Sequence, residues 1–234
     1  MKDYIQSKKK TMSKYFNQDF HDFFKELAAN NTKDWMDENR KRYTKNIKEP
    51  FENFIKDLQT EVSKFDEEIL VKPNDSIFRI NRDIRFSKDK APYKLDRSAI
   101  ISKHGRKDKQ YPGFYISISP QDTYIGGGAY FLENEALQKV RQEISYNLKE
   151  FDQLVNNKKF KQNFGEIKGE KAKRLAPEFQ EDEKVQALIA NKGFYYMKDL
   201  DANIIFKDDF LETIVEKYKT AKPFNDFLRR AIYH

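Results

Sequence analysis

The stretch from Gly113 to Gly128, GFYISISPQDTYIGGG, decides the fold class of this chain. β-branched and aromatic side chains in its first half predict a strand over 113–119. Pro120-Gln121-Asp122 supplies turn-forming residues, and a second strand is predicted over 122–125. A connection as short as this one joins antiparallel neighbours, so the stretch predicts part of an antiparallel sheet.

Elements on both sides of this hairpin follow from hydrophobic periodicity. Runs rich in β-forming residues predict further strands over 76–80, 93–102 and 194–197. Thr32 is the expected N-cap of the second helix, and Pro50 is the expected first-turn residue of the third. Apolar residues spaced three and four apart predict amphipathic helices over 20–27, 32–43, 50–62, 137–164 in pieces, 184–191, 208–218 and, separately, from Pro223 onward.

Composition predicts one folded domain. Gly and Pro number only 8 and 7 of 234 residues, which favours long regular elements, while 20 Phe and 13 Tyr predict an aromatic core. No Gly/Ser linker or internal repeat divides the chain. We expect a single α+β domain over 16–234, with a mainly antiparallel sheet of about four to six strands packed against several helices. A flexible basic tail is expected over 1–15.

The residue inventory excludes several classes of site. Because cysteine is absent, the chain has no disulfide, no thiolate zinc site and no cysteine nucleophile. His21, His104 and His234 are too scattered to indicate a ligand set, so no metal site is predicted. No apolar run approaches the roughly 18 residues of a membrane span, and we expect a cytoplasmic protein without membrane contact. The sequence identifies no cofactor and no catalytic residue, and it does not decide whether the protein is an enzyme.

The net charge of +7 originates in one segment, Lys72–Lys109. This segment holds twelve Lys and Arg against five Asp, while the rest of the chain holds 33 basic and 33 acidic residues. A local excess of positive charge attracts phosphates, nucleic acid or acidic partners.

The densest part of this segment is RINRDIRF at 79–86, followed by DKAPYK at 89–94. If it is extended, alternate residues share a face, which predicts one face made by Phe78, Ile80, Arg82, Ile84 and Phe86. Arg82 would then need a carboxylate or phosphate partner, because a buried unpaired charge is unfavourable. Asp83 is expected to stay ionised, since arginines flank it.

These residues lead to a predicted anion site. Arginine forks bind carboxylate or phosphate groups through paired hydrogen bonds, a lysine adds a point charge, and a tyrosine offers a hydroxyl or a stacking face. The interpretation favoured here is a small anionic or phosphorylated ligand, held by Arg79, Arg82, Asp83, Arg85, Lys90 and Tyr93. The alternatives are a non-enzymatic module that binds nucleic acid or an acidic protein, and a purely structural Arg–Asp motif.

The run Gly126–Gly128 lies between a predicted strand and a predicted helix. Backbone N–H groups in such a place can form an anion-binding nest. The run matches neither a phosphate-binding loop nor a dinucleotide-binding fingerprint, so a tight turn or bulge is the favoured interpretation.

Residues 79–93 resemble the pattern R-x-x-R-D-x-R-F-x-x-D-K-x-P-Y of domain-of-unknown-function family 2461, uncharacterised and mainly bacterial proteins of similar length. Asn31, Trp35 and Pro50 are similar to the N-terminal signature of that family, and Gly126–Gly128 with Arg141 to a later one. The resemblance covers nearly the whole chain from Phe20 onward. It implies a single domain that contains helices and strands, and it implies no activity.

Overall fold

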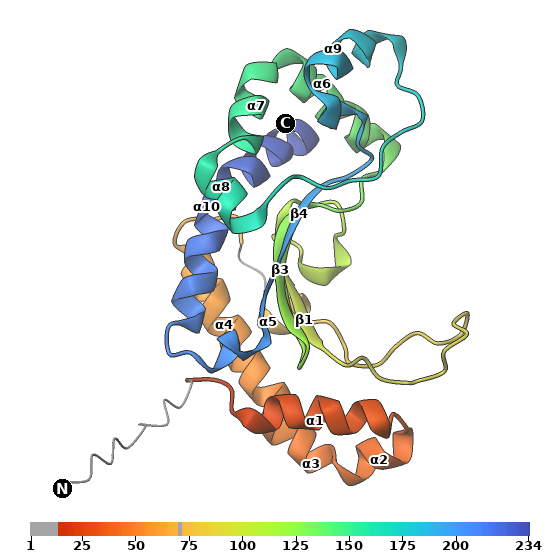
Figure 1. Cartoon of the computed structure of the whole chain (residues 1–234), viewed down its shortest axis with the longest axis vertical. Coiled ribbons are helices and arrows are strands. Elements are labelled where there is room, and N and C mark those ends of the chain that lie inside the picture. The colour runs from red at the N-terminus through yellow and green to blue at the C-terminus, as the bar shows by residue number, and fades with distance from the viewer. Residues whose placement is uncertain (1–13, 70–71) are drawn as a thin grey trace, which may run out of the picture.

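The computed structural model describes residues 14–69 and 72–234. A four-stranded sheet in the order β1-β2-β3-β4 is antiparallel throughout, with helices over one face and beyond both ends of the strands (Figure 1). The predicted α+β fold with a mainly antiparallel sheet is confirmed. The strands are β1 (Arg97–Ile101), β2 (Gly113–Ile118), β3 (Asp122–Ala129) and β4 (Phe194–Asp201).

The helices largely follow the predicted apolar stripes. Thr32 is the N-cap of α2, as predicted, and its hydroxyl accepts a hydrogen bond from the backbone N–H of Trp35 at 3.3 Å. The α-helices are α1 (Gln18–Ala29), α2 (Lys33–Glu38), α3 (Arg40–Tyr43), α4 (Glu49–Ser63), α5 (Pro73–Ser76), α6 (Asn134–Tyr146), α7 (Leu148–Val155), α8 (Lys158–Phe164), α9 (Gln180–Val185) and α10 (Phe210–Tyr233). A π-helical turn, Thr44–Lys48, joins α3 to α4.

The N-terminal end of the described chain is attached to α4. Lys14 and Tyr15, the last residues of the predicted tail, both bond to the carboxylate of Asp57, at 2.8 and 2.6 Å. The ordered domain therefore begins before residue 16. The rest of the predicted tail, residues 1–13, lies outside the described residues.

The predicted strand over 76–80 is wrong. Its first residue ends α5, and after it an isolated bridge pairs Ile77 with Ala99. The backbone N–H of Phe78 donates to the carbonyl of Ser98 at 2.9 Å, so the segment follows the edge of β1 for only two residues. The chain then turns away from the sheet. The returning chain rejoins the sheet only at Arg97, so β1 begins there and not at the predicted residue 93.

The two helices predicted over 208–218 and from Pro223 are one helix, α10. Proline removes one intrahelical hydrogen bond, which is why the sequence pattern predicted a new helix at this residue. The buried stripe of α10 nevertheless continues through Tyr218, Ala221, Phe224 and Phe227. Packing of this stripe against the sheet and α4 holds both halves in one helix.

The two faces of the sheet have different surroundings. Ile116 and Ile125 are register partners with no exposed surface, and they lie on the face that α10 and α4 cover. The opposite face, here called the open face, carries the next row of register partners, Ile100, Tyr115, Gly126 and Met197. In Figure 1 the open face is on the concave side of a crescent-shaped molecule.

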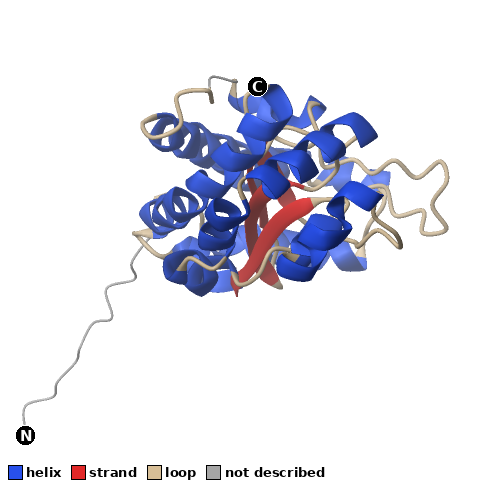
Figure 2. Ribbon diagram, turned by 90° about the horizontal axis from the view of Figure 1, so that it is seen from above, coloured by secondary structure: helices blue, strands red, loops and turns tan. Residues whose placement is uncertain are grey.

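A long loop, residues 79–94, leaves the sheet edge on the same side and is here called the arm. The backbone closes its base, since the N–H of Lys94 donates to the carbonyl of Ile80 at 2.8 Å and Asn81 bridges Tyr93. The arm is the yellow loop that extends furthest from the sheet in Figure 1, and loops also project beyond the helices on this side in the view from above (Figure 2).

Candidate functional site

A hollow in the open face is the candidate site. Gly113 and Gly128 are register partners on β2 and β3, and Gly126 lies two residues along β3 on the same face. Three neighbouring positions of the sheet therefore carry no side chain. The space above them has a volume of about 560 Å³.

These glycines do not form the turn or bulge that the sequence predicted. Gly126–Gly128 lie inside β3 and pair with strands on both sides in an unbroken register. Gly128 has a φ of +85°, a conformation that favours glycine. A Cβ atom on Gly126 would lie 2.5 Å from the backbone oxygen of Tyr196, so the close approach of β4 also requires glycine.

Aromatic and apolar side chains surround the glycine floor. Tyr130 and Phe131 are 74% and 51% exposed, although residues of this size are usually buried. The ring of Tyr130 meets the ring of Tyr195 edge to face, with 4.9 Å between the centroids. The remaining apolar and aromatic lining comes from Phe78, Ile100, Tyr111, Phe114, Tyr115, Tyr196 and Met197.

The hydroxyl of Tyr115 is a polar group of the open face. It interacts with the side chains of Ser98 and Ser117, which occupy the next row of the sheet. Burial raises the pKa of the Tyr115 hydroxyl, so the phenol is neutral and can both donate and accept a hydrogen bond at physiological pH.

The rim of the hollow is positively charged. Arg106 and Lys109 line it together with Asp108. The Asp108 carboxylate already accepts two backbone N–H groups, at 2.9 and 3.0 Å, and Arg106 donates to the carbonyl of Asn74. Within residues 14–69 and 72–234, Lys109 has no ion pair or hydrogen bond. The ammonium of Lys109 is therefore available to an incoming anion.

The six residues of the predicted anion site lie in the arm and line neither this hollow nor the two others described below. Arg82 forms an ion pair with Asp89 and donates to the carbonyl of Ala91 at 3.1 Å. The prediction that Arg82 needs a carboxylate partner is confirmed. The predicted apolar face is wrong at its last residue, because Phe86 is 95% exposed, whereas Arg82 and Ile84 are half-buried between exposed neighbours.

The other arm residues are bound mostly within the arm. Arg85 holds Asp83 through two hydrogen bonds of 3.0 and 2.7 Å. These bonds, together with the field of Arg79, lower the pKa of the Asp83 carboxyl, which agrees with the predicted ionised state. The ammonium of Lys90 donates to the carbonyl of Ile84 at 3.0 Å.

Tyr93 and Arg79 have opposite environments. Tyr93 is buried, and its backbone forms two hydrogen bonds with the side-chain amide of Asn31, at 2.9 and 3.1 Å. Arg79 is exposed and has no ion pair or hydrogen bond in the described part of the chain. The hydrogen bonds and ion pairs among residues 79–93 thus brace the arm. Ligand binding by the cations of the arm stays a prediction.

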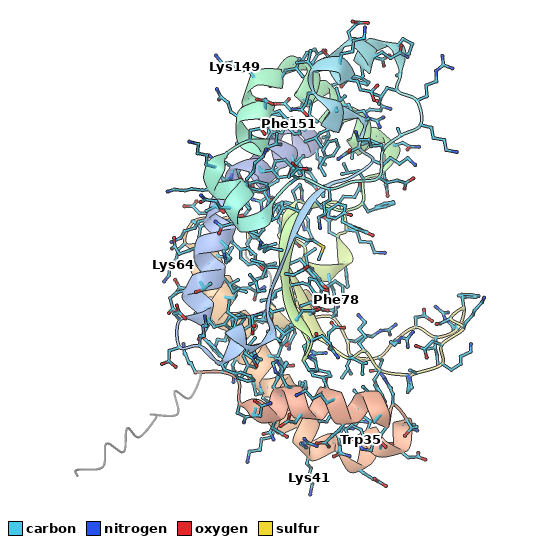
Figure 3. The ribbon with its side chains drawn as sticks, viewed as in Figure 1. Trp35, Lys41, Lys64, Phe78, Lys149 and Phe151 are labelled. Atoms are coloured by element: carbon cyan, nitrogen blue, oxygen red, sulfur yellow. The ribbon has the colours of Figure 1, made fainter. Side chains whose placement is uncertain are left out.

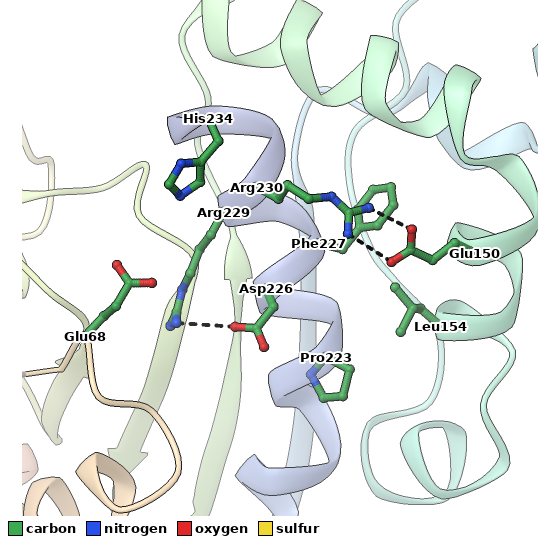
Figure 4. Close-up of a pocket in the computed structure, with 9 residues that line it drawn as sticks. All are labelled: Glu68, Glu150, Leu154, Pro223, Asp226, Phe227, Arg229, Arg230 and His234. Atoms are coloured by element: carbon green, nitrogen blue, oxygen red, sulfur yellow. Dashed lines mark hydrogen bonds and ion pairs between the residues drawn. The ribbon is translucent and has the colours of Figure 1, made fainter.

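A second hollow, of about 520 Å³, lies beside the end of α10 (Figure 4). Its charged groups are paired with one another or with neighbours. Arg230 binds Glu150 at 2.7 Å, and Arg229 is held by the buried carboxylate of Asp66 through two bonds of 2.8 Å. These pairs tie α10 to α7 and to the chain after α4, which is a structural role.

A third hollow, of about 360 Å³, adjoins the first and shares Tyr130, Phe131 and Tyr195 with it. The described residues contain no cluster of three His, Cys, Asp or Glu side chains able to hold a metal ion. They also contain no helix that is long and apolar enough to cross a membrane.

The sequence pattern did not identify the hollow. Its floor is made by glycines of two strands, and its walls by Phe78 and by residues of segments 100–131 and 195–197. One feature of the sequence could have indicated the hollow: glycine occurs at 113 and at 126–128, within or beside predicted strands. Glycine in a strand often marks a place where another group approaches the backbone.

Comparison with known proteins extends over most of this architecture. No curated protein matches the chain. The model of a family described as conserved hypothetical protein (DUF2461) matches residues 19–227. The match runs from the first turn of α1 into α10 and so includes the sheet, the arm and the hollow. The chain therefore belongs to the DUF2461 family of conserved hypothetical proteins.

Proposed function

We propose that the protein binds a small molecule with a flat apolar group and a negative charge, such as a nucleotide, in the hollow of the open face. The observation that carries the proposal is the floor of three neighbouring glycines beneath a space of about 560 Å³. Small-molecule sites are typically concave, mostly apolar and about 300–1,000 Å³ in volume.

The lining fits a planar group. The missing side chains of Gly126 and Gly128 let a ring approach the sheet backbone, and Tyr195 with Tyr130 supplies aromatic surface beside it. Aromatic rings pack on one another in offset or edge-to-face arrangements and contribute about 0.5–1.5 kcal/mol beyond the burial of their area. The ring of Tyr115 adds further aromatic surface to the lining.

The rim favours an anion. Segment 102–109 carries four basic residues and one acidic residue, and two of these cations, Arg106 and Lys109, line the hollow. A guanidinium and an ammonium at one mouth attract a phosphate or carboxylate group. The only carboxylate among the described lining residues, Asp108, is occupied by backbone N–H groups, so we propose binding and assign no reaction.

We also infer the setting of this binding from two features of the sequence. The chain is free of cysteine, which is typical of reducing compartments, and its arm resembles the pattern of a family of mainly bacterial proteins. We therefore place the protein in the cytoplasm of a bacterium.

Isothermal titration with AMP, adenosine and ribose 5-phosphate tests the proposal. We expect AMP to bind more tightly than either fragment, because only AMP has both the ring and the charge. Tyr195→Ala should weaken AMP binding by about three- to tenfold through the lost aromatic contact. Lys109→Glu should weaken AMP binding and leave the weaker binding of adenosine unchanged.

Two matched variants serve as controls. Tyr124 lies on the open face outside the hollow, and Lys107 is an exposed neighbour of Lys109 that does not line it. Tyr124→Ala and Lys107→Glu should bind AMP like the unmodified protein. Absence of heat and of a thermal shift with all three compounds at millimolar concentration, or equal losses in the control variants, would reject the hollow as a site.

A further inference from the structure

The tip of the arm presents an aromatic side chain to solvent. Phe86 is 95% exposed, the highest value among the exposed large apolar side chains of the described residues. The guanidinium of Arg85 lies 5.9 Å from the centre of its ring. So exposed a phenylalanine gains little from burial in the monomer, and its ring is accessible to another molecule.

Contacts within the arm hold this tip away from the domain. The pair Arg82–Asp89 connects the two sides of the arm, and Lys90 binds the carbonyl of Ile84 across it. Asn31 fixes the base through the backbone of Tyr93. The arm is therefore braced, which reduces the conformational entropy that Phe86 would lose on binding.

Positive charge surrounds the tip. Residues 79–94 contain six basic and two acidic residues, a net charge of +4. Both carboxylates, on Asp83 and Asp89, are neutralised by arginines of the arm. Arg79 and Lys88 are exposed and have no ion pair within residues 14–69 and 72–234. The unpaired cations are the part of this surface that a polyanion would meet.

We propose that the arm is a contact for single-stranded nucleic acid, in which Phe86 stacks on an unpaired base while the unpaired cations Arg79 and Lys88 bind phosphates of the same strand. Bases offer a flat face regardless of sequence, and stacking on an aromatic side chain combined with basic groups along the backbone is the general mode of sequence-tolerant single-strand binding. A base within a duplex is already stacked on both faces, so single strands are favoured.

The size of the expected contact follows from this geometry. One stacked base contributes at least about a fivefold change in affinity when the aromatic side chain is removed. Each phosphate that is neutralised on a single strand contributes about −0.7 to the slope of log K against log salt. Binding should therefore be weak, strongly dependent on salt and sensitive to the substitution of Phe86.

Fluorescence anisotropy with labelled oligonucleotides of about 20 nucleotides tests the inference at low salt. The probes are one mixed sequence as single-stranded DNA, as single-stranded RNA and as duplex DNA, which shows whether the sugar matters. Binding to a single strand should be tighter than to the duplex. Phe86→Ser should reduce it at least about fivefold, and Arg79→Glu with Lys88→Glu should reduce both the affinity and the salt slope.

Matched controls come from the far end of the molecule. Tyr146 is an 81% exposed aromatic residue at the end of α6, and Lys149 is an exposed lysine of α7 that lies far from Phe78, where the arm begins (Figure 3). Tyr146→Ser and Lys149→Glu should leave binding unchanged. Because Phe86, Arg79 and Lys88 are exposed, thermal melting of the variants should match that of the unmodified protein.

Three outcomes would overturn the inference. The first is absence of single-strand binding at low salt, and the second is binding that does not depend on Phe86. The third is equal, Phe86-dependent binding of poly-glutamate, which would assign the arm to an acidic protein instead. The AMP site is measured separately by the variants of Tyr195 and Lys109, so failure of one proposal leaves the other intact.

Discussion

His21 in α1 is buried, and its Nε2 atom has no hydrogen-bond partner within the described chain. Its ring contacts the ring of Phe206 at 4.8 Å between centroids. Burial, followed by the field of Lys25, lowers the pKa of the His21 imidazole below its usual value. The neutral ring is therefore the form that fits the folded protein.

This burial predicts a dependence of stability on pH. The folded pKa of His21 is lowered, so the unfolded chain takes up the proton first as the pH falls. The free energy of unfolding should be at its full value above about pH 6.5 and should decrease below it. Urea denaturation between about pH 7.5 and 5.5 measures the change.

The substitution His21→Gln removes the titrating group and should flatten this dependence, whatever its effect on the absolute stability. His104 is exposed, and His104→Gln should keep the slope of the unmodified protein. A slope that survives His21→Gln would assign the pH dependence to other groups.

Residue-scale predictions from the sequence succeeded where the partners are close along the chain. The carboxylate partner of Arg82 lies seven residues away, and the partner of Asp83 lies two residues away. The exposure of Phe86 was not predicted, because alternation between faces holds only in a strand. The chain leaves the sheet after Phe78, and the sequence pattern contains no sign of that departure.

At the scale of elements, α10 shows how packing overrides a local signal. Pro223 lies inside this 24-residue helix and leaves the helix one hydrogen bond short. Pro223→Ala should restore an N–H donor and raise the free energy of unfolding by up to about 3 kcal/mol, the difference between proline and alanine in a helix interior. Chemical denaturation measures this gain.

Lys219→Ala, an exposed substitution in the same helix, is the control and should stay within about 0.5 kcal/mol of the unmodified protein. If Pro223→Ala gives no gain, a bend at this residue is needed to seat Phe224 and Phe227 in the core.

The hollow shows that the sequence can predict where a strand lies but not its register with the neighbouring strands. The first strand and the turn of the central hairpin were predicted to within one residue, because residue types and turn are local signals, but the second strand was predicted to end four residues too early, before the glycine run. The hollow depends on register, which places Gly113 opposite Gly128 and Tyr195 beside it. Register is set by burial of the opposite face and by the partner strands, and single-strand patterns do not contain that information.

At the scale of the whole molecule, the charge excess lies on one side. The arm and segment 102–109 both belong to the basic stretch identified in the sequence, and both lie on the open side of the sheet (Figure 1). The remainder of the chain has equal numbers of acidic and basic residues. A field of this kind steers anionic ligands towards the open face and weakens with salt.

Removal of the arm separates the two proposed sites in one protein. The backbones of Asn81 and Tyr93 are bridged, so replacing residues 82–92 by an Asn-Gly turn should join them as a tight hairpin. The shortened protein keeps the contact between Asn31 and Tyr93 and loses mostly exposed side chains. Its free energy of unfolding should therefore stay within about 1 kcal/mol of the parent value.

The shortened protein should bind AMP with unchanged affinity, because no replaced residue lines the hollow. It should lose single-strand binding at least as completely as Phe86→Ser, since four of the six cations of the arm are removed as well. Titration calorimetry and anisotropy on the same preparation provide both measurements. Loss of AMP binding in a protein that still melts cooperatively would mean that the arm closes over the hollow, and the two surfaces would then have to be treated as one site.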